Sequence, residues 1–197
     1  MTLRQQMMAT VAAASLALVA APSLAQTASP PASASASQAA MPMGEAEMKH
    51  GMDTAMVGSL SLATSRVAEG KASDAMVKKF ATFEVAEQET ISDVLMSIKA
   101  SPAEAEGALK KPTEAEVEAM LDPAGKTELE KLNGLSGAEF DKAYVAVQLD
   151  GHRKLLTIQE DYLKVGQNRE HLDVAKLARG QIREHIAILE ELQKKVG

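Results

Sequence analysis

The chain of 197 residues contains no cysteine. This absence excludes disulfide bonds, thiolate metal sites, cysteine nucleophiles and a lipid anchor attached to cysteine. The chain also has no tryptophan, and only three phenylalanines and two tyrosines. Its core must therefore consist of Leu, Val, Ile, Ala and Met, and this composition favours helices because strands are enriched in aromatic residues. The sequence predicts an all-α protein.

Basic residues are fewer than acidic ones. The chain carries 21 Lys and Arg against 27 Asp and Glu, so its formal net charge is −6 at pH 7. No basic block or aromatic-interleaved basic patch offsets this charge, so we expect neither a nucleic-acid partner nor attraction to anionic membranes. A Gly-rich phosphate loop, a nucleophile-elbow motif and a His-Glu-x-x-His motif are missing as well. These absences favour a protein that is not an enzyme.

Long apolar runs are missing except near the start of the chain. Residues 7–21 are apolar and follow Arg4. Ser23 and Ala25 are small residues at the two positions that a signal peptidase recognises before its cleavage site. We therefore interpret residues 1–25 as a signal peptide and expect a periplasmic or envelope-associated protein. Because the apolar run is shorter than the ~20 residues of a membrane span, and no later run is longer, we expect no transmembrane span.

Residues 26–52 are interpreted as a disordered tether, since their first part consists of Ala, Ser, Pro and Gln without charge or periodicity. Its second part is rich in methionine. Thioether sulfur and imidazole nitrogen are ligands that copper(I) prefers, so this part is a candidate copper site. Its candidate ligands are Met41, Met43, Met48, His50 and Met52. The alternative is that unbranched methionine simply suits a linker or a fraying helix start.

From residue 53 to residue 197 the pattern predicts a four-helix bundle domain. Apolar residues recur at spacings of three and four, which predicts long helices over 53–70, 74–100, 137–165 and 169–196. We expect Met56, Leu60, Ala63 and Val67 to face the core from the first of them, and Ser73 and Asn168 to cap the second and the last. Capping-box patterns start at Thr113 and Ser136, and an Asp-Pro pair starts at Asp122. The proline- and glycine-punctuated stretch 101–135 therefore predicts a long crossover connection with two short helices between the second and third long helices.

Polar side chains interrupt three of these apolar seams near mid-height. They are Glu84 and Glu87 in the second long helix, His152 in the third and His185 in the last. Two carboxylates and two imidazoles suit a divalent ion such as Fe, Mn or Zn, with Gln88, Gln148 and Gln181 as outer partners. A dinuclear oxidase centre is not expected, because the chain has no Glu-x-x-His and no acid on the predicted inward face of its first helix.

The alternative for the same residues is a hydrogen-bonded polar layer that sets the helix register and binds nothing. Of the remaining polar and aromatic candidates, His171 is expected to be a solvated surface residue next to Glu170. Phe140 and Tyr144, at helical spacing, are expected to pack in the core.

Three stretches resemble a known family. They are Val77-Lys78-Lys79-Phe80-Ala81, the run from Leu135-Ser136-Gly137 through Phe140-Asp141 and Tyr144 to His152, and His185 in the last helix. The chain resembles exported bacterial proteins that carry an outer membrane label and a domain of unknown function, placed among ferritin-like four-helix bundles. The resemblance implies export and a ferritin-like four-helix bundle with a long crossover.

The chain departs from this family's pattern at three places. Near Ser61 the family often carries a glutamate, and this chain has none. Where the family shows Asp-His, this chain has Glu87-Gln88 in the second helix and Gly151-His152 in the third. These departures imply a smaller metal capacity than the family pattern allows. Together, residues and resemblance favour an exported, non-enzymatic binding or stress-related module with an unknown protein partner in the envelope. Metal binding by the central Glu/His layer, and copper(I) binding by the tether, are the alternatives.

Overall fold

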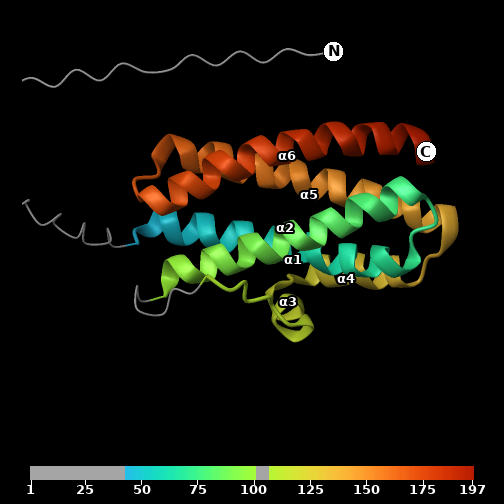
Figure 1. Ribbon diagram of the computed structural model, residues 1–197, viewed down its shortest axis with the longest axis horizontal. Coiled ribbons are helices and arrows are strands. Elements are labelled where there is room, and N and C mark those ends of the chain that lie inside the picture. Colours follow the sequence, from blue (N-terminus) through green and yellow to red (C-terminus); the bar gives the residue numbers. More distant parts are fainter. Residues whose placement is uncertain (1–42, 101–106) are drawn as a thin grey trace, which may run out of the picture. The chain divides into compact units, whose positions relative to one another are not determined.

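The computed structural model describes residues 43–100 and 107–197, and in these ranges the chain is all-helical, with no strand (Figure 1). The predicted signal peptide, most of the predicted tether and Met41 lie outside the described residues. The helices are α1 (Glu45–Lys71), α2 (Ala75–Lys99), α3 (Glu114–Met120), α4 (Pro123–Asn133), α5 (Gly137–Val165) and α6 (Arg169–Val196). The all-α prediction is confirmed for this part of the chain.

The long helices pack as two hairpins. One hairpin is α1 with α2, the other is α5 with α6, and α1 also packs against α5 (Figure 1). The short helices α3 and α4 both contact α1 and belong to the connection between α2 and α5. Apolar side chains of α2, α5 and α6 form the main core together with Ala68 of α1 and Leu132 of α4, and Phe140 and Tyr144 are completely buried in it, as expected. No described helix combines the length and apolarity needed to cross a membrane.

The first helix begins at Glu45, eight residues before the predicted start. Glu45 and Glu47 occupy its first turn, where negative charge is favourable at the positive end of the helix dipole. The backbone N–H of Gly44 also donates to the Glu47 carboxylate, over 3.1 Å. The prediction of a disordered tether is therefore wrong for residues 45–52.

The buried face of α1 also differs from the prediction. Met56, Leu60, Ala63 and Val67 are only partly buried. The most buried face is instead polar and small, and its members are Glu47, His50, Gly51, Thr54, Gly58, Ser61, Leu62, Thr64, Ser65 and Ala68. The physical reason is that this face of α1 contacts its neighbours mainly through hydrogen bonds and not through apolar packing. These hydrogen bonds join the polar face to α2 and α5.

Two predicted helix caps are wrong and three are confirmed. Asp74, not Ser73, accepts the first amide N–H groups of α2, because Ser73 donates its own N–H and hydroxyl to Asp141 instead. Ser136 occupies the N-cap position of α5 but makes no side-chain cap hydrogen bond, and the residue after it, Gly137, has a positive φ of 59°. The caps that the structure confirms are Thr113, Asp122 and Asn168.

Candidate metal centre

Three side chains from three helices converge in the middle of the bundle. They are Glu84 of α2, His152 of α5 and His185 of α6. Glu84 Oε2 lies 3.3 Å from His152 Nε2 and 3.1 Å from His185 Nδ1, and the two nitrogens are 3.1 Å apart. All three side chains are buried. The three atoms therefore form a small and nearly equilateral triangle inside the protein.

The orientation of His152 determines which of its nitrogens carries the proton. Its Nδ1 lies 2.8 Å from the backbone carbonyl oxygen of Gln148, one helical turn earlier. A carbonyl oxygen only accepts hydrogen bonds, so Nδ1 must be the N–H of this imidazole. In the neutral ring, Nε2 then carries a lone pair and directs it at Glu84 and His185. This is how a histidine is presented to a metal ion.

The two carboxylate oxygens of Glu84 have different surroundings. Its Oε1 accepts hydrogen bonds from the Ser61 hydroxyl (2.5 Å) and from Gln88 Nε2 (2.9 Å). Its Oε2 is buried and makes no hydrogen bond of good geometry, although both imidazoles lie within 3.3 Å. Burial alone would raise the pKa of Glu84, but the two adjacent imidazoles of His152 and His185 and the hydrogen bond from Ser61 hold it well below its usual range. The carboxylate is therefore charged, with Oε1 hydrogen-bonded and Oε2 facing the two imidazole nitrogens.

His185 lies between the buried cluster and the partly exposed Glu87. Its Nδ1 faces Glu84 and His152, while its Nε2 lies 3.3 Å from Glu87 Oε2. Burial lowers the pKa of His185, but the hydrogen bonds and negative charges of Glu84 and Glu87 outweigh it and raise the pKa to about 9. Of the four predicted ligands, the structure brings three together and places Glu87 behind His185, in contact with its far nitrogen. Glu87 thus orients His185 and does not belong to the triangle.

The outer partners were predicted in part. Gln88 and Gln148 contact the cluster, whereas Gln181 makes no hydrogen bond within the described residues. Ser61 of α1 was missed as an outer partner. Its hydroxyl lies 2.6 Å from Gln148 Oε1, in addition to its contact with Glu84. Its only sequence signal is the polar series Ser61, Thr64 and Ser65 at helical spacing, which could have indicated a polar inward face.

A second buried polar cluster lies near the start of α1 and the start of α6. His50 Nδ1 lies 2.9 Å from His171 Nδ1, and His50 Nε2 lies 2.7 Å from Gln159 Oε1. The Glu47 carboxylate accepts hydrogen bonds from the Tyr162 hydroxyl and from two backbone N–H groups after α5. The prediction that His171 is solvated is wrong, because this residue is fully buried against His50.

The candidate copper ligands do not share one site in the described residues. His50 is buried and its ring nitrogens face His171 and Gln159, whereas Met48 and Met52 are 52 % and 64 % exposed. Met43 is partly buried just before α1. The structure therefore separates the imidazole of His50 from the exposed thioethers.

The sequence of this chain is similar to a known protein family. Residues 30–192 match a protein-family model described as a domain of unknown function (DUF4142). Neither the curated proteins nor the solved structures contain a match to the chain. Because the matched residues make up most of the sequence, this all-helical chain belongs to the DUF4142 family, whose function is unknown.

Proposed function

We propose that this protein is a non-enzymatic metal-binding module that holds one divalent transition-metal ion between Glu84, His152 and His185. The observation that carries the proposal is the buried triangle of Glu84 Oε2, His152 Nε2 and His185 Nδ1, in which Oε2 has no hydrogen bond of good geometry. A buried carboxylate requires a compensating positive charge. In the metal-free protein the imidazolium of His185 supplies it, and a bound metal ion would replace that proton.

The size of the donor triangle supports this proposal. Its edges measure 3.1, 3.1 and 3.3 Å. The usual metal–nitrogen and metal–oxygen distance is about 2.1 Å. An ion at this distance from each donor would have donor–metal–donor angles of about 95° to 105°. These angles lie between those of octahedral and tetrahedral sites. The three donors can therefore hold an ion with little movement.

The donor types and their support indicate which ions are suitable. Two imidazoles and one carboxylate suit Zn, Fe and Mn, whereas a soft ion that requires sulfur would find none in the triangle. Each donor is oriented from behind, His152 by the Gln148 carbonyl, Glu84 by Ser61, and His185 by Glu87. Such outer partners are typical of metal sites, and they reduce the reorganisation that binding requires.

We further propose that the domain is exported to the periplasm and has a ferritin-like four-helix topology. The amino-terminal pattern of residues 1–25 supports export. The two hairpins α1–α2 and α5–α6, joined by a long connection that contains α3 and α4, support the topology. The stress-related role and the envelope partner expected from the sequence stay predictions.

Elemental analysis of the untagged protein tests the metal proposal. We expect about one Zn, Fe or Mn per chain after reconstitution and dialysis, and a loss of this metal in the double variant His152→Ala/His185→Ala. The matched control is His171→Gln, which alters a buried histidine of the same bundle outside the triangle. No stoichiometric metal in the wild type, or equal metal in the double variant, would show that the cluster is a structural layer, with His185 as a buried imidazolium.

A further inference from the structure

One face of α2 is exposed although it carries large apolar side chains. Phe83, Met76 and Val94 are 56 %, 49 % and 38 % exposed. The chain has five aromatic side chains, all among the described residues, and the other four are at most 5 % exposed. Phe83 is thus the one aromatic side chain left to solvent, in a protein that buries its few aromatic residues.

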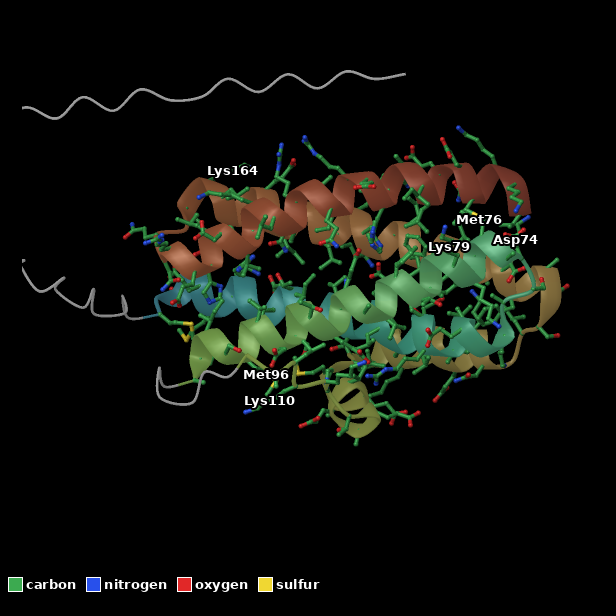
Figure 2. All side chains as sticks on the ribbon, viewed as in Figure 1. Asp74, Met76, Lys79, Met96, Lys110 and Lys164 are labelled. Atoms are coloured by element: carbon green, nitrogen blue, oxygen red, sulfur yellow. The ribbon has the colours of Figure 1, made fainter. Side chains whose placement is uncertain are left out.

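The residues of this face follow the spacing of a helix–helix seam. We define the α2 face as Met76, Lys79, Phe83, Ala86, Thr90, Val94 and Ser97, and all seven are exposed. They succeed one another at intervals of three or four residues over most of α2 (Figure 2 labels Met76 and Lys79 on it). Such spacing is typical of a surface that packs against another helix. No described helix covers this face.

Two residues of opposite charge on α2, Lys79 and Asp93, lie symmetrically about Ala86. Lys79 lies seven residues before Ala86, and Asp93 lies seven residues after it. Neither residue forms an ion pair with the described part of the chain, and the Lys79 ammonium group sits 5.8 Å from the centre of the Phe83 ring. Two copies of α2 in parallel would oppose Lys79 to Lys79, whereas two antiparallel copies place Lys79 of each beside Asp93 of the other.

We propose that the α2 face joins two copies of this chain in an antiparallel, two-fold symmetric dimer centred on Ala86. The small Ala86 side chain lets the two helices approach closely at the symmetry axis. Phe83 of each copy then packs near Thr90 of the other, and Met76 lies near the opposite end of the other helix, around Val94 and Ser97. A two-fold interface uses the same patch twice, so it contains two Lys79–Asp93 pairs.

This inference does not depend on the proposed metal site. None of the seven residues of the α2 face belongs to the Glu84, His152 and His185 triangle. The dimer can therefore be measured on metal-free protein, and metal content can be measured on variants of the α2 face. Failure of either proposal leaves the other unaffected.

Sedimentation equilibrium of the untagged full-length protein tests the dimer. We expect a concentration-dependent monomer–dimer equilibrium for the wild type. Lys79→Glu and Asp93→Lys should each raise the dissociation constant about tenfold or more, because each converts two attractive pairs into two repulsive ones. The double variant Lys79→Glu/Asp93→Lys should restore the dissociation constant to within about threefold of wild type, because it exchanges the charges without removing the pairs.

Controls separate the interface from general effects on the surface. Phe83→Glu should abolish the dimer, whereas Val165→Glu, which places the same charge at an exposed apolar residue of α5, should leave it unchanged. Circular dichroism would verify that each variant is folded. A protein that stays monomeric at every concentration would overturn the proposal, as would a dimer that tolerates Phe83→Glu or is not restored by the charge exchange.

Discussion

Replacing Ser61 by alanine tests how the structure holds the Glu84 carboxylate. The Ser61 hydroxyl donates to Glu84 Oε1 over 2.5 Å, and Glu84 is completely buried. A hydrogen bond to a charged buried group contributes about 1.5–3 kcal/mol, and alanine leaves a carboxylate oxygen with one donor fewer. We therefore expect Ser61→Ala to lower the free energy of unfolding by about 2 kcal/mol.

Urea denaturation of the metal-free protein, followed by far-UV circular dichroism, measures this loss. For a domain of this size, about 2 kcal/mol corresponds to a decrease in melting temperature of roughly 4–8 °C. The matched control is Ser59→Ala, the same change on the same helix at a partly buried position without a hydrogen bond to Glu84. It corrects for the higher helix propensity of alanine, and we expect it to change the stability by less than about 0.5 kcal/mol.

The same variant should also weaken metal binding. Removal of an outer partner of a metal ligand typically lowers the metal affinity about 10- to 100-fold. Zinc titration in competition with a chromophoric chelator would measure this change for Ser61→Ala and Ser59→Ala. Equal stabilities of the two variants, within about 0.5 kcal/mol, would refute the argument that Ser61 supports Glu84.

Three further predictions concern how the free energy of unfolding depends on pH, on a glycine in α6 and on bound zinc. The backbone N–H of Gln167 and neighbouring donors outweigh burial and lower the pKa of Glu47 to about 2, from an ordinary 4.5. Because this pKa is depressed in the folded state, its stabilisation is complete above about pH 4.5 and is lost as the pH falls towards 2. In Glu47→Gln the free energy of unfolding, measured by urea titration, should therefore decrease less between about pH 4.5 and pH 2 than in the wild type. An equal decrease in both proteins would contradict this prediction. Gly180→Ala should raise the free energy of unfolding by about 0.5–1 kcal/mol, since an added Cβ meets no atom within 4 Å in the middle of α6, and destabilisation would indicate an unrecognised contact. Zinc at 100 times its dissociation constant should stabilise the protein by about 2.7 kcal/mol, an effect that calorimetry should no longer detect in His152→Ala/His185→Ala.

Much of the helical structure could be predicted, because three long segments carry a regular apolar signal. The apolar spacing in α2, α5 and α6 follows the helical period over many turns, and the predicted limits of these helices agree closely with the structure. Their seams also located Glu84, His152 and His185, since a polar residue inside an apolar seam stands out. That these three residues meet could only be suggested, because the order of the helices depends on the long connection before α5.

The parts that were missed belong to α1 and its partners. The buried face of α1 consists largely of Ser, Thr, Gly and His, so apolar periodicity pointed to the wrong side of this helix. Its partners are distant in sequence: His50 and His171 are 121 residues apart, and no local pattern relates them. Polar networks specify partners by hydrogen bonds, and these depend on three-dimensional neighbours that composition does not reveal.

The Glu47 carboxylate limits how far this domain can be shortened from its amino-terminal end. It accepts hydrogen bonds from the backbone N–H groups of Gln167 and Asn168, in the turn that separates α5 from α6. A chain cut at residue 53, where apolar periodicity begins, would therefore lose more than a flexible end. The turn would lack its acceptor and His171 would lose His50. The shortest independently folding piece of this protein should thus start before residue 45.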